Sequence, residues 1–169
     1  MGDKQVPYLA KREPPFSIYA DRLAMEELVY KFAGNDQELK GVHTVRRQVF
    51  VEEQEIPVDI VFTEDKRNDE MNIVAKVKEI VIGTIKVQII DNNTAKLERM
   101  AILKRFRGKG IGRGIISFVH EQLQYRNIKF VFLHAQQPVI DFYKSCGFSE
   151  IGSPFFEAGI KHVKMEMHY

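Results

Sequence analysis

Hydrophobic and polar residues alternate with period two in the middle of the chain. This alternation over residues 73–77 and 81–89 is typical of half-buried β-strands, and residues 78–79 between them predict a hairpin. A third alternating run covers residues 95–103, after a turn at residues 91–93. Three consecutive antiparallel strands are therefore expected here.

Helical spacing appears before these strands. Apolar residues three or four positions apart predict a helix over about residues 36–51, and Asn35 and Glu38 have the spacing of a capping box. A short strand is expected at residues 27–33. An irregular, charged loop with one helical turn is expected at residues 56–68.

The pattern changes again after the third strand. A glycine-rich basic loop, residues 105–114, leads into a segment with one apolar face at residues 115–123, which predicts a second helix. The continuous apolar run at residues 130–133 is typical of a strand covered on both faces. A short helix at residues 139–146 and closing strands at residues 148–152 and 163–168 follow. The predicted fold is α/β, with an antiparallel meander followed by a strand-helix-strand crossover.

Composition narrows the range of functions. The 169 residues include 25 Lys and Arg against 23 Asp and Glu, and this net charge of +2 does not by itself indicate a nucleic-acid partner. We expect one domain over residues 25–169 after an N-terminal extension, residues 1–24. The single Cys146 excludes an intrachain disulfide, and no apolar run approaches the ~20 residues of a membrane span. A cytoplasmic protein without a membrane partner is expected. No residues have metal-ligand spacing, so no metal is expected.

The loop from Arg107 to Gly112 carries the clearest chemistry. Its glycines let backbone amides approach an anion, and the following helix N-terminus favours negative charge, which suits a pyrophosphate. Lys109 and Arg113 add charge at the rim. The spacing matches neither the G-x-G-x-x-G fingerprint nor the P-loop. A flexible basic loop, or a nucleic-acid contact through the same cations, explains the loop nearly as well.

Several motifs in order resemble the GNAT superfamily of acyl-CoA-dependent N-acetyltransferases. They lie at residues 97–103, 107–112 (R-G-K-G-I-G), 130–135 and 142–148 (F-Y-K-S-C-G-F). The resemblance covers about residues 27–169. A finer similarity to the ElaA-like or YjcF-like branch rests on residues 46–54, 133–136 and 157–162.

The resemblance implies a GNAT-like fold and acetyl-CoA as co-substrate. The loop amides would hold the pyrophosphate of coenzyme A, and the third strand would pair with the pantetheine arm like an added strand. A backbone amide near Ala101 would stabilise the oxyanion. The residues so assigned to acetyl-CoA are Met100, Ala101, Ile102, Leu103, Arg107, Gly108, Lys109, Gly110, Ile111, Gly112, Arg113, Phe142 and Tyr143. Many members place Asn after the fifth core strand to bind pantetheine, whereas Gln136 and Gln137 stand there in this chain.

The resemblance also implies that Tyr143 protonates the departing sulfur. A thiolate of pKa ~8.5 is already a fair leaving group, so such an acid needs to help only modestly. Tyr143 is spaced with Val139, Phe142 and Cys146 as an ordinary core residue would be. Spacing alone favours the core, and the motif favours the catalytic role.

The acceptor amine must lose a proton, because an alkylammonium has a pKa of ~10.4. Glu98 is the first candidate base and is expected on the same face as Met100 and Ile102; an ion pair with Lys96 or another base is its alternative. His134, at the end of an apolar strand, is the second candidate, with a structural histidine as the alternative.

Two other features bear on the chemistry, the acidic stretch at residues 52–53 and the single cysteine. Glu52 and Glu53 could attract a cationic amine or form a solvated acidic turn. Cys146 has no paired base in the sequence, so an acyl-cysteine mechanism is not expected.

The expected function is transfer of an acetyl group from acetyl-CoA to a primary amine by direct attack in a ternary complex. The acceptor would be a small molecule or a protein amine. The alternatives are a catalytically silent acyl-CoA sensor or scaffold and, third, a nucleic-acid-binding domain. Exposed strands at the C-terminal end make a homodimer plausible.

Overall fold

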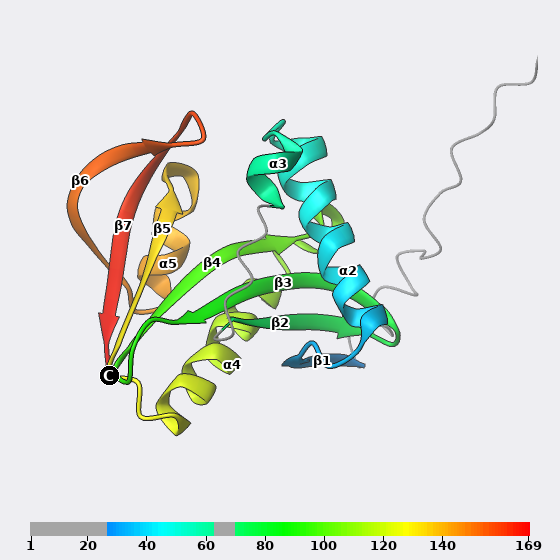
Figure 1. Ribbon diagram of the computed structural model, residues 1–169, viewed down its shortest axis with the longest axis horizontal. Coiled ribbons are helices and arrows are strands. Elements are labelled where there is room, and N and C mark those ends of the chain that lie inside the picture. The colour runs from blue at the N-terminus through cyan, green and yellow to red at the C-terminus, as the bar shows by residue number, and fades with distance from the viewer. Residues whose placement is uncertain (1–26, 63–69) are drawn as a thin grey trace, which may run out of the picture.

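The computed structural model describes residues 27–62 and 70–169, and the predicted N-terminal extension at residues 1–24 lies outside them. These residues form an α/β domain around one seven-stranded sheet of order β1-β2-β3-β4-β5-β7-β6 (Figure 1). Neighbouring strands are antiparallel, except that β4 and β5 are parallel. The predicted meander and crossover are thus confirmed.

The strands are β1 (Leu28–Phe32), β2 (Glu70–Val77), β3 (Ile80–Ile89), β4 (Thr94–Ile102), β5 (Phe130–Gln136), β6 (Ser149–Glu157) and β7 (Ile160–His168). The α-helices are α2 (Asp36–Arg46), α3 (Val58–Val61), α4 (Ile111–Tyr125) and α5 (Ile140–Ser145). A π-helix, η1 (Arg47–Glu53), continues α2, and the 3-10 turns η2 (Lys104–Phe106) and η3 (Gln137–Val139) precede α4 and α5. The closing strands β6 and β7 are longer than predicted.

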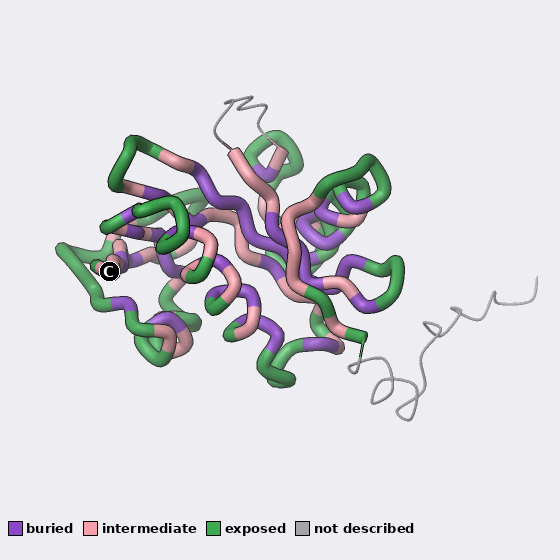
Figure 2. Tube along the Cα trace, turned by 90° about the horizontal axis from the view of Figure 1, so that it is seen from below, coloured by how far each residue is buried: buried purple, intermediate pink, exposed green. Residues whose placement is uncertain are grey.

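Two apolar clusters hold the layers together. The larger lies between the sheet and α4, where Ile115, Val119 and Leu123 are almost fully buried, as their spacing predicts. The smaller lies on the opposite face, where Val42 and Val45 of α2 pack on β2 and β3. Figure 2 shows that the buried residues follow the strands and the inner faces of the helices.

The start of α2 is capped as its sequence predicts. The Asn35 side chain accepts a hydrogen bond from the Glu38 amide at 2.8 Å, and Glu38 accepts one from the Gly34 amide at 2.8 Å. In a capping box the Glu38 carboxylate would accept from the amide of the N-cap residue, Asn35; here it accepts from the amide of Gly34, one residue earlier. At the other end, η1 carries the helical path to Glu53, two residues past the predicted end, and so includes Glu52.

β4 and β5 separate part-way along their length. Their ladder joins Thr94–Leu97 to Phe130–Leu133 and then stops, so the sheet opens between the two strands (Figure 1). This gap places the cavity described below.

A β-bulge in β4 lies at the same point. Glu98 pairs with Lys86 and Ala101 pairs with Thr84, so two residues, Arg99 and Met100, stand opposite one residue of β3. Arg99 takes a left-handed backbone conformation, with φ of 52°.

The extra residue reverses the alternation of side chains along β4, so that even-numbered residues before and after the bulge point to opposite faces of the sheet. Before the bulge, Glu98 shares a face with Lys86 on the α2 side; after it, Met100 and Ile102 pack against the α4 cluster. The prediction that Glu98 lies on the same face as Met100 and Ile102 is therefore wrong. It assumed regular alternation, which a single inserted residue reverses.

β5 also differs from its prediction. Val131, Leu133 and Ala135 are buried in the α4 cluster, but alternate residues on the other face are only half-buried. The expectation of a strand covered on both faces is wrong. α2 packs on β2, β3 and β4 and leaves this face of β5 largely uncovered.

Candidate active site

A cavity of about 720 Å³ occupies the gap between β4 and β5. One part of its lining, the loop side, comprises loop residues 106–108 and 110–113 and the side chains of Phe142 and Tyr143. The opposite part, the hairpin side, is formed by Phe50, Gln54, Glu98, His134, Gln136, Glu157 and His162. The cavity therefore connects the α4 face of the sheet with the α2 face.

The glycine loop on the loop side presents backbone rather than side chains. Gly108 and Gly110 have φ of 73° and 80°, and a Cβ at either position would meet nothing within 4 Å. Gly110 is the N-cap residue of α4, and no side chain caps this helix start. Because the amides of a first helical turn have no partner within the helix, those of Ile111, Gly112 and Arg113 can bind an anion. This geometry fits the predicted pyrophosphate contact.

Gly112 allows close packing below the loop. A Cβ there would lie 3.1 Å from Phe142 and 3.2 Å from both Ile102 and Met100. A side chain would push α4 away from β4 and α5 and so disturb both walls of the cavity.

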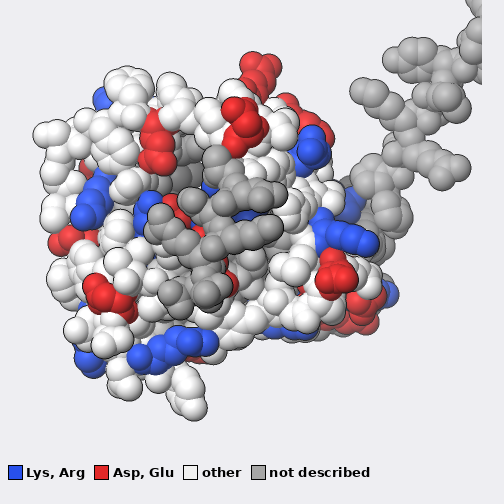
Figure 3. All heavy atoms as spheres, viewed as in Figure 1, with Lys and Arg blue, Asp and Glu red and all other residues white. Residues whose placement is uncertain are grey.

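The arginines of the loop also bind the protein itself. Arg107 donates to the carbonyl of Ile102 at 2.8 Å and forms an ion pair with Glu53 at 2.8 Å, while Arg113 donates to the carbonyl of Ser145 at 2.9 Å. On the face shown in Figure 3, acidic and basic side chains are interspersed. These observations favour a cavity wall over a nucleic-acid surface.

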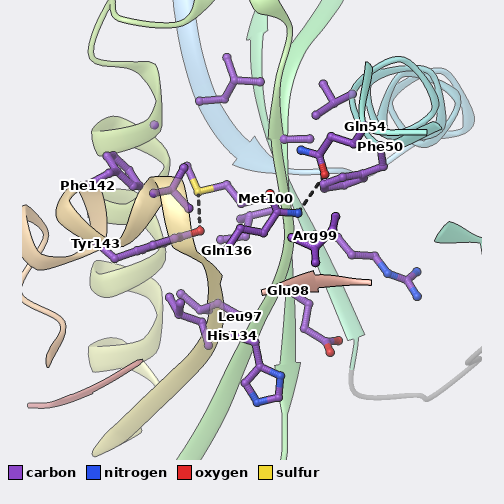
Figure 4. A pocket seen from close by; sticks show the side chains of 18 of the residues that line it. Phe50, Gln54, Leu97, Glu98, Arg99, Met100, His134, Gln136, Phe142 and Tyr143 are labelled. Carbon is purple, nitrogen blue, oxygen red and sulfur yellow. Dashed lines mark hydrogen bonds between the residues drawn. The ribbon is translucent and has the colours of Figure 1, made fainter. Parts of the chain in front are cut away.

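Tyr143 is both a core residue and a cavity residue. Its ring packs on Phe142 and Phe148 and is 8% exposed, yet its hydroxyl points to the gap and donates to the Met100 sulfur at 3.5 Å (Figure 4). Burial raises its pKa above the ordinary value, and nearby Cys146 adds to the shift. The hydroxyl is therefore protonated at neutral pH and can donate a proton.

Glu98 is held by two lysines. Its carboxylate lies 2.6 Å from the Lys96 ammonium and 3.5 Å from that of Lys86, which also contacts Glu70. Burial opposes ionisation, but the hydrogen bond from Lys96 and the charges of Lys96, Lys86 and Arg99 outweigh it, so the pKa of Glu98 is lowered. The ion pair considered in the sequence analysis is present, and it makes Glu98 a weak base.

His134 has an acidic partner that sequence reasoning missed. Its Nδ1 lies 3.0 Å from a carboxylate oxygen of Glu157, and the edge of the Phe155 ring packs against it at 4.9 Å between centroids. Glu157 lies in the segment at residues 157–162, which contributes to the family resemblance without implying a role for this carboxylate. Nothing in the local pattern could pair residues 23 positions apart.

A second missed contact crosses the cavity wall. The Gln136 amide donates to Gln54 at 2.9 Å, joining the end of β5 to the residue after η1 (Figure 4). Gln136 stands where many family members have Asn, and Gln54 lies in the resembling segment at residues 46–54, but neither pattern indicates that the two side chains meet.

Cys146 does not line the cavity. Cys146 is half-buried, and burial raises the pKa of its thiol, which disfavours a nucleophilic thiolate. Within residues 27–62 and 70–169 no three His, Cys, Asp or Glu residues could hold a metal ion together. No helix in the same ranges is long and apolar enough to cross a membrane.

Comparison with known proteins decides the family. Residues 30–169 match the model of the acetyltransferase (GNAT) domain. The chain belongs to the GNAT acetyltransferase family. This GNAT chain is 31% identical over 134 residues to the uncharacterized N-acetyltransferase YjcF of Bacillus subtilis, covering 79% of this chain and 94% of YjcF.

Solved structures show the same GNAT fold. Escherichia coli ElaA matches with a TM-score of 0.74 at 22% identity, over 83% of this chain and 99% of ElaA. A GNAT family acetyltransferase from Elizabethkingia anophelis with acetyl-CoA bound matches with a TM-score of 0.60 at 14% identity, over 85% and 99% of the two chains. As a member of the GNAT family, the protein is an acyltransferase that uses acetyl-CoA.

Proposed function

We propose that the protein transfers an acetyl group from acetyl-CoA to a primary amine, which attacks the thioester directly while both substrates are bound. One observation carries this proposal: a single cavity joins the loop side to the hairpin side through the gap between β4 and β5. Two substrates can meet there, and Cys146 is poorly suited to a covalent intermediate.

The loop side would hold acetyl-CoA. Amides of residues 108–113 would bind the pyrophosphate, and the edge of β4 facing the gap would pair with the pantetheine arm. The same edge is left without a strand partner after Leu97, so its backbone is available for this pairing.

The register of β4 refines the oxyanion contact. The Leu103 amide donates to the Ile82 carbonyl, and ladder bonds alternate along an antiparallel pair, so the Ala101 amide is directed toward Thr84 of β3. The bulge residues Arg99 and Met100 stand between two hydrogen-bonded pairs, Glu98 with Lys86 and Ala101 with Thr84. We therefore assign the oxyanion contact to the amide of Met100, one residue before the predicted Ala101.

Tyr143 would protonate the sulfur. As the tetrahedral intermediate collapses, the carbon–sulfur bond breaks and the Tyr143 hydroxyl supplies a proton to the thiolate. The acceptor amine would lose its proton on the hairpin side, where Glu98 and His134 are the candidate bases.

Calorimetric titration with acetyl-CoA, with double-stranded DNA as comparison, tests the first half of the proposal. Release of the coenzyme A thiol in the presence of a panel of primary amines tests the second half. We expect acetyl-CoA binding in the micromolar range and amine-dependent thiol release. Absence of acetyl-CoA binding would refute the proposal, and binding without turnover on any amine would favour the silent sensor.

A further inference from the structure

We infer that His134 and Glu157 act as a couple, in which His134 is the base that takes the proton from the acceptor ammonium and Glu157 is its positioning residue. The inference rests on the proposed function, since it names the base for that reaction. It also makes Glu98 an electrostatic neighbour rather than the base.

The contact with Glu157 sets the tautomer of His134. An ionised carboxylate only accepts hydrogen bonds, so Nδ1, 3.0 Å from Glu157, carries the ring proton. In the neutral ring the other nitrogen, Nε2, then has a free lone pair. Among the described residues, Nε2 has no hydrogen-bond partner, and His134 lines the cavity.

The fold brings the couple to the opening of the gap. His134 follows Leu133, which forms the last rung between β5 and β4, so the histidine stands where the two strands begin to separate. β7 pairs with every residue of β5. Glu157 is the last residue of β6, at the hairpin that leads into β7, and its carboxylate contacts the His134 ring. Phe155 packs edge-on against the ring and limits its rotation.

The charged groups around His134 leave Glu157 as its one acidic partner among the described residues. On β7, Lys164 is paired with His134 in the ladder, but its ammonium lies over the Phe132 ring at 4.7 Å. His162 binds the carbonyl of its own neighbour Ile160 at 2.8 Å. On β4, the charges facing this region are Glu98 and Lys96, which form an ion pair with each other.

The contrast with Glu98 favours His134 as the base. A carboxylate next to two ammonium groups loses basicity, and protonating it would break two ion pairs. A proton taken by His134 would instead leave an imidazolium that still contacts its one carboxylate partner, Glu157. Histidine is also the side chain whose charge changes near neutral pH.

The proton balance closes with these residues. His134 Nε2 takes one proton from the ammonium, directly or through one water, and later returns it to solvent. The amine nitrogen then bonds to the thioester carbon, and the carbon–sulfur bond breaks. The nitrogen loses a second proton, Tyr143 gives one to sulfur, and this second proton restores Tyr143. One proton is released overall.

Single variants test the inference, first His134→Asn and Glu157→Gln, with His168→Asn and Glu166→Gln as matched controls. His168 and Glu166 also form a histidine–glutamate contact, at 3.6 Å, but neither lines the cavity. For each variant, kcat, the KM for the amine, the pH profile of kcat and the Kd for acetyl-CoA are measured.

We expect His134→Asn to lower kcat about 100-fold, the usual contribution of a general base, and to remove the low-pH limb of the kcat profile. Glu157→Gln should lower kcat about tenfold, because a glutamine amide can donate to Nδ1 and so favour the wrong tautomer. Glu157→Asp should retain more of the rate than Glu157→Gln. The Kd for acetyl-CoA should stay unchanged in these variants. The two control variants should match the wild type in all four measured quantities.

The outcomes separate the inference from the proposed function. A wild-type protein without turnover on any amine overturns both. If the wild type turns over, the inference is overturned when His134→Asn keeps the rate and the low-pH limb, or when Glu98→Gln removes that limb instead. If His134→Asn fails to fold, His134→Gln and rescue of His134→Ala by added imidazole give the same decision.

Discussion

The two sides of the cavity are built in different ways. The loop side presents mainly backbone, from two left-handed glycines and the uncapped start of α4, and it adjoins the free edge of β4. The hairpin side consists of side chains from η1, β4, β5 and the β6–β7 hairpin. Backbone amides suit a constant ligand such as the pyrophosphate of coenzyme A. Side chains can differ from one relative to another and so suit a specific acceptor.

The two sides also handle charge differently. The loop side offers unpaired amides and a protonated tyrosine, whereas the acidic groups of the hairpin side are already paired, Glu98 with lysines and Glu157 with His134. The difference predicts that loop-side changes affect acetyl-CoA binding or sulfur departure. Hairpin-side changes should affect the acceptor and stability.

The largest effect is expected for Gly110→Asp on the loop side. The new carboxylate would face the pyrophosphate, and like-charge contacts cost several kcal/mol, so the Kd for acetyl-CoA should rise about 100-fold or more. Gly152→Asp is the matched control, since Gly152 also has a positive φ and open space but lies outside the cavity. Equal affinities for the two variants in a calorimetric titration would place the cofactor elsewhere.

Tyr143→Phe should separate chemistry from binding. Loss of the hydroxyl should lower kcat by about 10- to 100-fold, the lower end for a general acid, because a thiolate leaves readily. The Kd for acetyl-CoA should change little. Tyr169→Phe removes another buried hydroxyl outside the cavity and serves as control. Parallel losses of turnover and affinity in Tyr143→Phe would mean that the residue is chiefly structural.

Glu98→Gln should affect stability more than the pH profile of catalysis. The change leaves Lys96 without its carboxylate and Lys86 with Glu70 only, so we expect a loss of about 1–3 kcal/mol in unfolding free energy. Urea unfolding measures the loss. A normal stability combined with loss of the low-pH limb of kcat would instead identify Glu98 as the base.

The smallest effect concerns Glu38, far from the cavity. The Gly34 amide and Lys31, helped by Lys76, outweigh burial and lower its pKa to about 2. The unfolded carboxyl titrates near 4.5, so this stabilisation is complete above that pH and is lost as the pH falls toward 2. Glu38→Gln should cost about 1–2 kcal/mol at pH 7 and almost nothing at pH 2. A constant difference in unfolding free energy across this range would contradict the assignment.

Much of the fold could be predicted because its signals are local. Period-two and period-three-to-four patterns located most strands and helices, and Asn35 with Glu38 marked the start of α2. The bulge at Arg99 could not be predicted, since an inserted residue has no local signature unless glycine marks it. The half-buried face of β5 also depended on where α2 ends, which is a property of packing.

The candidate site divides in the same way. The residues assigned to acetyl-CoA form contiguous motifs, and the structure brings all of them into the lining of one cavity except Leu103 and Lys109. The partners of the candidate bases could not be read from the chain, because Glu157 reaches His134, and Gln54 reaches Gln136, only through the pairing of distant segments.

The sequence by itself determined the α/β order, the anion-binding glycine loop and the similarity to the GNAT family, because each depends on neighbours within a few residues. The tertiary structure decided which face Glu98 occupies, which residues neutralise it and which carboxylate holds His134. The reason is physical: a side chain's chemistry depends on charges within a few ångströms, and strand pairing, not sequence distance, decides which charges those are.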